Sequence, residues 1–287
     1  MSKPKAIILT GYGLNCEEET AEAFTLAGGE AVIVHINDLI AKPAMLKRFQ
    51  ILAIPGGFSY GDDLGGGKAY ANKLNNHLKK HLAEFASKNK LIIGICNGFQ
   101  ILTQAGLLPG ALTFNDNNRY TDRWVDVKIL QASPSVIARS ASDEAISNKK
   151  KIASAALAMT KSFSPWLKGI KSLSLPIAHG EGKFVAAPDV LKSLKKQHQI
   201  AGVYYKGEVC RYQNLAANPN GSLADIAMVT SEDGKILGIM PHPERAMYFT
   251  QRPMWPLMKE KLIRKNQSLP KYGPTFQLFK NAVNYFK

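Results

Sequence analysis

The chain has 287 residues, a formal net charge of +15 at pH 7 and three cysteines. No stretch approaches the roughly 20 uncharged apolar residues that a membrane-spanning helix needs. The first five residues lead directly into a strand-like segment, without the apolar core of a signal peptide, so we expect a cytoplasmic protein. Cys16, Cys96 and Cys210 are odd in number and far apart in the chain, which indicates reduced thiols rather than a disulfide framework.

Most of the excess positive charge lies in two segments. Residues 131–172 carry seven Lys or Arg against two acidic residues, and residues 251–287 carry eight against one. Together they account for twelve of the fifteen excess charges. This distribution favours a solvated basic insertion and tail, and leaves an acidic partner surface or RNA as alternatives.

The first half of the chain alternates short apolar runs with longer amphipathic stretches. Strands are expected at residues 6–9, 31–35, 51–54 and 91–95, and helices at residues 17–27, 69–87 and from 98 onward. Such alternation predicts an α/β fold, in which helices cover both faces of an open, mostly parallel sheet.

The second half of the chain has a different rhythm. Short strands are expected at residues 125–130, 175–177, 202–205 and 224–229, joined by polar loops, and we expect them to complete one domain over residues 1–287. A segment rich in Ser, Ala and Lys, at about 131–172, interrupts the pattern and is expected to be an exposed insertion, because surface loops tolerate added length at small cost. The basic segment at about 251–287 is expected to form a helical tail.

The sharpest local signal is the run GICNGFQ at residues 94–100, between an apolar strand and a helical stretch. Glycines two residues either side of Cys96 permit a tight strand-to-helix turn that holds a nucleophile in a strained, exposed position. The thiol would also lie at a helix N-terminus, where backbone N–H groups and the helix dipole favour a thiolate and can bind an oxyanion. A buried cysteine without chemistry is the alternative reading of this run.

A thiol nucleophile needs a base, and the run GIMPHPER at residues 238–245 offers His242 after another apolar strand. Glu244 projects to the same side as His242 if the backbone is extended, as the flanking prolines favour, and can orient the imidazole. On its own, His-Pro-Glu is also compatible with a surface turn. Coupled to the cysteine turn, it favours a catalytic interpretation.

A glycine-rich loop, PGGFSYGDDLGGGK, occupies residues 55–68 directly after a strand. A phosphate-binding loop is the obvious rival, but Asp62 stands where that motif has its first glycine, and Ala69 stands where it needs Ser or Thr. The two acidic residues of the loop would also repel phosphate. We interpret the backbone N–H groups of Gly56 and Gly57 as donors to a reacting carbonyl, with a flexible turn as the alternative.

Several stretches together resemble the glutamine amidotransferase subunits of phosphoribosylformylglycinamidine synthase, and the amidotransferase domain of the long form of that enzyme. The matching stretches are residues 13–17, 56–62, 94–100, 176–182 and 241–245. The cysteine turn and His-x-Glu are shared by class I glutamine amidotransferases, whereas His-Gly-Glu-Gly and Pro-His-Pro-Glu-Arg are more particular to this synthase. The resemblance spans nearly the whole chain except residues 131–172, and it implies a flavodoxin-like α/β fold.

The resemblance implies a role for each matching residue. Cys96 would be the nucleophile, His242 the general base and acid, and Glu244 its orienting partner, while Cys16 and Cys210 match no catalytic position. The backbone N–H groups of Gly57 and Asn97 would form the oxyanion hole. The residues expected at the oxyanion hole and around the bound glutamine are Gly56, Gly57, Asn97, Gln100, Gly180 and Glu181.

The implied activity is hydrolysis of L-glutamine to glutamate and ammonia through a cysteine thioester. Ammonia would pass to an ATP-dependent synthetase subunit that converts formylglycinamide ribonucleotide to the formylglycinamidine in de novo purine biosynthesis. We expect no cofactor in this chain, because ATP and magnesium belong to that partner, and a small accessory subunit is a further expected partner. No metal is expected either, since His77 and His81 share a helix face without an evident third ligand.

The chain departs from the family pattern at two places. Asn117 stands where a serine is usual, and residues 131–172 have no counterpart. Three alternatives remain: a glutaminase of another class I amidotransferase serving GMP, CTP or anthranilate synthesis, a stress-response or peptidase-like relative, and a non-catalytic nucleic-acid-binding protein. Salt-dependent affinity would identify the last of these.

Overall fold

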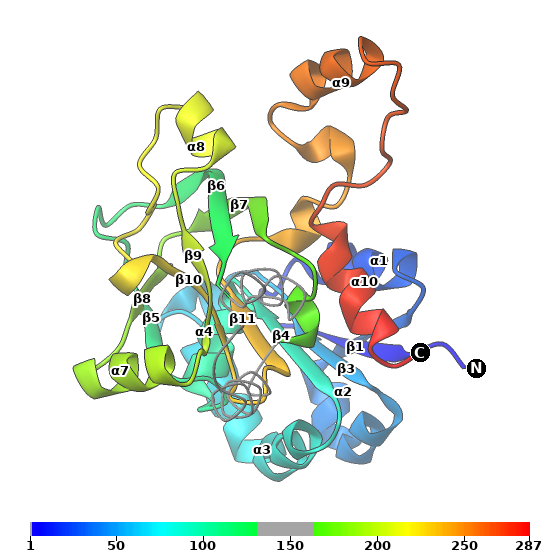
Figure 1. Ribbon diagram of the computed structural model, residues 1–287. Coiled ribbons are helices and arrows are strands. Elements are labelled where there is room, and N and C mark those ends of the chain that lie inside the picture. The colour runs from blue at the N-terminus through cyan, green and yellow to red at the C-terminus, as the bar shows by residue number, and fades with distance from the viewer. Residues whose placement is uncertain (1, 131–163) are drawn as a thin grey trace, which may run out of the picture.

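The computed structural model describes residues 2–130 and 164–287. Within them a nine-stranded sheet has the order β2-β1-β3-β4-β11-β10-β9-β6-β7 (Figure 1). Its strands are β1 Lys5–Thr10, β2 Glu30–His35, β3 Ile51–Ile54, β4 Leu91–Ile95, β6 Thr121–Ile129, β7 Ser172–His179, β9 Ile200–Tyr204, β10 Ile226–Thr230 and β11 Ile236–Ile239. A separate two-stranded sheet pairs β5 Ala111–Thr113 with β8 Lys183–Val185.

Helices connect these strands. The α-helices are α1 Glu17–Leu26, α2 Ile36–Ala41, α3 Lys68–Ser87, α4 Asn97–Gln104, α7 Pro188–Lys196, α8 Glu208–Tyr212, α9 Trp255–Ile263 and α10 Phe276–Asn284. The 3₁₀ helices are η1 Pro43–Arg48, η2 Ser59–Asp62, η3 Pro165–Leu167, η4 Leu223–Asp225, η5 Pro243–Arg245 and η6 Phe249–Gln251. No described helix has the length and apolar character that crossing a membrane requires.

The sheet is mostly parallel, as the alternating pattern predicts. β2, β1, β3, β4 and β11 are parallel neighbours, whereas β10 and β6 are each antiparallel to both of their neighbours. Seven of the nine described strands of this sheet therefore point the same way. The predicted class, an open and mostly parallel α/β sheet, is confirmed.

The positions of the helices follow from the handedness of the crossovers. The β1-α1-β2 connection moves to one side of β1, while the β3-α3-β4 connection moves away from it. Because parallel crossovers are right-handed, α1 and α3 must lie on opposite faces of the sheet. Figure 1 shows this, with α10 beside α1 on one face and α3 on the other.

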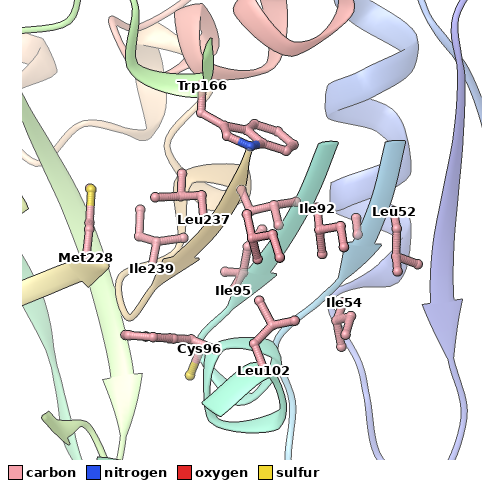
Figure 2. Close-up of a cluster of buried hydrophobic side chains, with 14 of the residues drawn as sticks. Leu52, Ile54, Ile92, Ile95, Cys96, Leu102, Trp166, Met228, Leu237 and Ile239 are labelled. Atoms are coloured by element: carbon pink, nitrogen blue, oxygen red, sulfur yellow. The ribbon is translucent and has the colours of Figure 1, made fainter. Parts of the chain in front are cut away.

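The central strands are buried on both sides, and their sequences show it. Every residue of β3, β4 and β11 is buried, as expected for strands with helices on both faces. Figure 2 shows their Leu and Ile side chains in one cluster, with Cys96 at its border beside α4. The predicted nucleophile is therefore part of the border of this apolar cluster.

The segment predicted as an exposed insertion lies largely outside the described residues, but its last part does not. Trp166 in η3 is fully buried, and its indole Nε1 donates to the carbonyl of Lys235 at 2.9 Å. Asn281 of α10 donates to the carbonyls of Trp166 and Lys168. Residues 164–170 thus help form the core, and the C-terminal limit predicted for an exposed insertion, at about residue 172, is wrong.

The basic C-terminal segment contains two helices of different character. α9 has no buried residue and stands away from the rest of the molecule (Figure 1). α10, in contrast, buries five residues, and its Phe279 packs edge-on against Phe24 of α1 at 5.2 Å. Only the first part of this segment behaves as the solvated tail that the charge pattern predicts.

Candidate active site

The predicted site residues follow strands that end at one edge of the sheet. β1, β3, β4 and β11 are parallel, and the carboxyl ends of parallel strands line a common crevice. Ile95 of β4 pairs with Ile239 of β11. Cys96 and His242 come one and three residues beyond these partners, so they leave neighbouring strands at the same edge.

Cys96 occupies the strained turn that its flanking glycines predict, but it is buried rather than exposed, with 4 % of its surface accessible. Its backbone has φ 51° and ψ −107°, a left-handed φ that few non-glycine residues adopt. The turn is held because the Cys96 N–H donates to Ile239 at 2.8 Å and its carbonyl accepts from Phe99 and Gln100. The sulfur lies 3.8 Å from the carbonyl oxygen of Ala178. The thiol is therefore fixed at the start of α4.

His242 and Glu244 form a direct buried pair. Nδ1 of His242 lies 2.6 Å from Oε1 of Glu244, and the two residues are 2 % and 1 % exposed. His242 has an extended backbone, and its N–H donates to Pro176 at 2.9 Å, which fixes the loop after β11 against β7. The carboxylate thus orients the imidazole, as the His-x-Glu spacing suggests.

The surroundings of His242 favour a charged imidazole. Burial alone would lower the pKa of His242, but the Glu244 carboxylate and the Cys96 and Cys16 thiols outweigh burial and raise that pKa well above its ordinary value. Among the described residues, Nε2 of His242 makes no hydrogen bond of standard geometry. Among these residues the imidazole is therefore hydrogen-bonded on its carboxylate side, while Nε2 is buried.

The first glycines of the loop after β3 lie against the imidazole. A Cβ on Gly56 would be 2.6 Å from Cε1 of His242, so a side chain at this position would displace the ring. Gly57 has φ 150°, and a Cβ there would collide with the carbonyl of Gly13. Gly57 also forms a β-bridge with Leu14 of the loop after β1. Both glycines are required by close approach rather than by flexibility.

Polar side chains join the glycine loop to α4 and to the loop after β7. Asn97 accepts from the N–H of Ser59 at 3.1 Å and donates to Oε1 of Gln100 at 2.7 Å. Gln100 in turn donates to the carbonyl of Glu181 at 2.8 Å. Oε2 of Glu181 accepts the N–H of Gly66 at 2.9 Å, which closes the network. Three of the residues predicted to surround glutamine, Asn97, Gln100 and Glu181, are thus hydrogen-bonded together.

The glycine loop is not suited to phosphate. Burial raises the pKa of Asp62, although hydrogen bonds from Gly67 and Asn97 oppose this, and the nearby Glu181 raises it further. The Gly66 N–H that could bind an anion already donates to the Glu181 carboxylate, which would repel phosphate. The sequence-based rejection of a phosphate loop has this structural counterpart.

Sequence reasoning assigned no role to Cys16 or Arg245, yet both lie at the site. Nη2 of Arg245 donates to the Cys16 sulfur at 3.0 Å, and Nε of Arg245 pairs with Glu19 at 3.5 Å. Burial raises the pKa of Cys16, against the opposing effect of His242. The position of Cys16 in the sequence could have predicted this, because Cys16 follows the carboxyl end of β1, on the same side of the sheet as Cys96.

Cys16, His242 and Glu244 are the group of described residues whose ligand atoms could surround a metal ion, since these atoms lie within 4.8 Å of one another. Two observations disfavour a cation here. The Arg245 guanidinium contacts the Cys16 sulfur, and Oε1 of Glu244 is already engaged by the imidazole. Two of the three groups, the Cys16 sulfur and the Glu244 carboxylate, therefore already have a partner in the protein.

The departure at Asn117 has a local explanation. Its Oδ1 accepts the N–H of Arg119 at 3.0 Å, which closes a tight turn between β5 and β6. Serine hydroxyls make the same kind of side-chain-to-backbone turn, only more weakly. Asparagine at this position therefore keeps the hydrogen bond that a serine would make.

Comparison with known proteins agrees with this chemistry. The CobB/CobQ-like glutamine amidotransferase domain matches residues 3–148 and 146–286. The phosphoribosylformylglycinamidine synthase subunit PurQ of Methanococcus maripaludis is 42 % identical over 295 residues, covering 99 % of this chain and 98 % of the relative. The subunit PurQ of Dehalococcoides mccartyi is 38 % identical with the same coverage.

A solved structure gives the same answer. The structure of PurLQS from Thermotoga maritima matches 99 % of this chain and 100 % of its own, with a TM-score of 0.66 and 28 % sequence identity. The matches to relatives run from end to end, so the likeness is not confined to the motifs around Cys96 and His242. The chain belongs to the CobB/CobQ-like glutamine amidotransferases and, among them, to the family of PurQ subunits of phosphoribosylformylglycinamidine synthase.

Proposed function

We propose that this chain is the glutaminase subunit of phosphoribosylformylglycinamidine synthase, which hydrolyses L-glutamine and supplies ammonia for de novo purine biosynthesis. One observation carries the proposal: a buried imidazole–carboxylate pair lies beside a cysteine held in a strained turn at a helix N-terminus. This is the arrangement that activates a thiol for attack on an amide. Membership of the PurQ family indicates that this amide is the side chain of glutamine.

In the first step, His242 takes the proton of the Cys96 thiol, and the sulfur forms a bond to the side-chain carboxamide carbon of glutamine. The backbone N–H groups of Gly57 and Asn97 would donate hydrogen bonds to the carboxamide oxygen as negative charge develops on it. His242 then gives its proton to the nitrogen as the carbon–nitrogen bond breaks. The products are ammonia and a γ-glutamyl thioester on Cys96.

In the second step, water releases the glutamate. His242 takes a proton from the water as its oxygen attacks the thioester carbonyl, and the carbon–sulfur bond breaks to return the thiolate. Glu244 stabilises the imidazolium in both steps through Nδ1, which is why the carboxylate must be buried and close. His242 thus receives the proton of the thiol in the first step and a proton of the water in the second.

The remaining predicted residues would bind the substrate. Gln100, Gly180 and Glu181 lie on α4 and on the loop after β7, which the network through Asn97 holds beside the thiol. Gly56 leaves room for the imidazole, and its backbone would lie beside the bound glutamine. These assignments rest on proximity to the Cys96 turn.

Ammonia would pass to an ATP-dependent synthetase subunit in the cytoplasm. ATP and magnesium would bind to that partner, and a small accessory subunit would complete the complex. The similarity to PurLQS of Thermotoga maritima supports such an assembly. No cofactor is assigned to this chain.

The test is a glutaminase assay with and without the matching synthetase subunit, combined with mass spectrometry of a glutamyl adduct on Cys96. Cys96→Ala should abolish hydrolysis and the adduct without loss of the fold, because the thiol forms the covalent bond. Cys210→Ala, which removes a buried thiol from α8, is the matched control and should retain both. Full turnover by the Cys96→Ala variant would sink the proposal.

A further inference from the structure

A second buried histidine, His179, lies at the end of β7 outside the proposed triad. It is 2 % exposed, and its Nδ1 is 3.1 Å from Oδ1 of Asn115. It begins the loop of residues 179–182, His-Gly-Glu-Gly, whose Glu181 contacts Gln100. The proposed mechanism gives His179 no task.

The contacts of Asn115 decide which atom of the pair donates. Its Nδ2 faces oxygens, the carbonyls of Arg119 and His179 at 2.9 Å each. Its Oδ1 must then be the acceptor, and it also receives the N–H of Gly182 at 3.0 Å. Since Oδ1 only accepts, Nδ1 of His179 carries a proton.

The contacts of Asn220 decide the state of the other ring nitrogen. Oδ1 of Asn220 accepts the N–H and the hydroxyl of Ser222, at 3.0 and 2.8 Å. Its Nδ2 therefore faces Nε2 of His179, at 3.5 Å, and donates to it, while also donating to the carbonyl of Gly182 at 2.8 Å. A proton on Nε2 would oppose that N–H, so only the neutral Nδ1–H form of His179 satisfies both neighbours.

The burial of His179 agrees with this reading, because burial lowers its pKa to about 4. The fit around the ring is also tight, since a Cβ on Gly182 would collide with the imidazole. The ring thus lies between Asn115, Asn220 and the Gly182 backbone as a spacer that cannot move without breaking hydrogen bonds. A rigid ring at this point fixes the residues on either side of it.

Those neighbouring residues reach the reacting groups. The carbonyl of Ala178, directly before His179, is 3.8 Å from the Cys96 sulfur. Glu181, two residues after it, accepts from Gln100 through its carbonyl and from Gly66 through its carboxylate. A shift of this loop would therefore move the group beside the thiol and the groups beside the predicted glutamine pocket together.

We propose that His179 is a positioning residue for glutamine hydrolysis: as a neutral imidazole held between Asn115 and Asn220, it fixes the loop that presents Ala178 to Cys96 and Glu181 to Gln100. The inference rests on the proposed glutaminase function and adds a residue to it. In this role His179 acts through the loop rather than on the substrate or the thiol.

Two variants distinguish the effect of the His179 hydrogen bonds from the effect of the volume of its ring. His179→Leu keeps an apolar side chain of similar length but removes both hydrogen bonds. His179→Asn places an amide N–H near the position of Nδ1 and keeps the bond to Asn115 available. Gln199→Leu is the matched control, because Gln199 is also buried and donates to the Thr230 carbonyl, but lies before β9 at the opposite edge of the sheet.

The assay is steady-state glutamine hydrolysis by the complex with the synthetase subunit. We expect His179→Leu to raise KM for glutamine by about tenfold to a hundredfold, with a smaller fall in kcat, because a displacement of about 1 Å is costly at a reacting site. His179→Asn should recover most of that loss. Gln199→Leu should leave KM and kcat unchanged even though it lowers the midpoint of thermal unfolding.

A second measurement tests the neutral state itself. As pH falls from about 6.5 towards 4, the unfolded chain takes up a proton on this histidine before the folded protein does, so the native protein loses stability. His179→Asn should lack this part of the acid-induced decline in the unfolding midpoint. An equally steep decline in that variant would overturn the assignment of a neutral His179.

The kinetic outcomes distinguish the two proposals. Normal KM and kcat in a folded His179→Leu variant would overturn the positioning role alone. Equal kinetic losses in His179→Leu and Gln199→Leu would also overturn it. The loss of activity would then come from lower protein stability and not from the position of His179 beside the site. Absence of glutamine turnover by the wild-type complex would instead overturn the proposed function.

Discussion

At the scale of single residues, the state of His242 depends on one carboxylate. The imidazole is buried, which by itself disfavours its charged form, and Oε1 of Glu244 at 2.6 Å reverses that preference. The Cys96 and Cys16 thiols act in the same direction. The charged form of His242 therefore depends chiefly on the Glu244 carboxylate.

Glu244→Gln should test this dependence, since it keeps the shape of the side chain and removes its charge. We expect kcat for glutamine hydrolysis to fall by about 10²- to 10⁴-fold, the usual contribution of a general acid–base group. The imidazolium would also lose its proton at lower pH, so the alkaline limb of the kcat/KM profile should move to lower pH. A profile unchanged in position would contradict the assigned role of the carboxylate.

At the scale of elements, the turn between β4 and α4 explains how the thiol is aimed. α4 approaches β3 so closely that a Cβ on Gly98 would collide with the backbone carbonyl of Ile54. A Cβ on Gly94 would likewise collide with the Gly98 carbonyl. The two glycines allow strand and helix to pack at backbone distance, and Cys96 between them takes up the strain at φ 51°.

Gly98→Ala should therefore cost stability and activity together. Overpacking against a backbone atom costs about 1–3 kcal/mol in unfolding free energy, and it would push the first turn of α4 away from β3. Urea unfolding and kcat/KM measure the two effects. Gly106→Ala is the control, because its φ of 74° adds backbone strain with no atom near the new Cβ, so it should lower stability and leave turnover unchanged. An unchanged unfolding free energy in Gly98→Ala would contradict this close packing of α4 against β3.

At the scale of the whole molecule, three distant parts of the chain close one face of the sheet. Phe24 of α1 packs against Phe279 of α10 at 5.2 Å and against Trp166 of η3 at 6.4 Å. Asn281 of α10 donates to the Trp166 carbonyl at 3.0 Å. The ends of the chain and the segment after residue 163 therefore stabilise each other, and α10 is part of the fold rather than an appendage.

Phe279→Ala should lower the unfolding free energy by about 3–5 kcal/mol, the usual cost of removing a buried aromatic ring. The comparison is Leu257→Ala on α9, where the side chain is 45 % exposed and the expected change is within about 0.5 kcal/mol. Chemical denaturation of both variants gives the difference. Similar losses in the two would mean that α10 does not belong to the core.

Much of this architecture is evident from local patterns. Apolar runs at β3 and β4 predict buried parallel strands because covered strands cannot alternate polar and apolar residues. Motifs that directly follow such strands must meet at one sheet edge, so Cys96 and the glycine loop are predictable neighbours. His242 and Glu244 are two residues apart, and their pairing follows from an extended backbone.

Other features depend on contacts that no local pattern contains. Trp166 looks like part of a polar, basic segment, and its burial is decided by α1 and α10. Cys16 lies beside His242 because the parallel strands β1 and β11 both end on the same side of the sheet, and the strand order places them close together. The neutral state of His179 depends on Asn115 and Asn220, which are 64 and 41 residues away along the chain.

By itself, the sequence determined the α/β class, the strand-turn-helix at Cys96 and the His-x-Glu pair, because each depends on neighbours a few residues apart. Only the tertiary structure decided which strand lies next to which, and with it the surroundings of His179 and Cys16. The physical reason is that strand order and side-chain burial arise from packing between segments far apart, where the same local pattern is compatible with several arrangements.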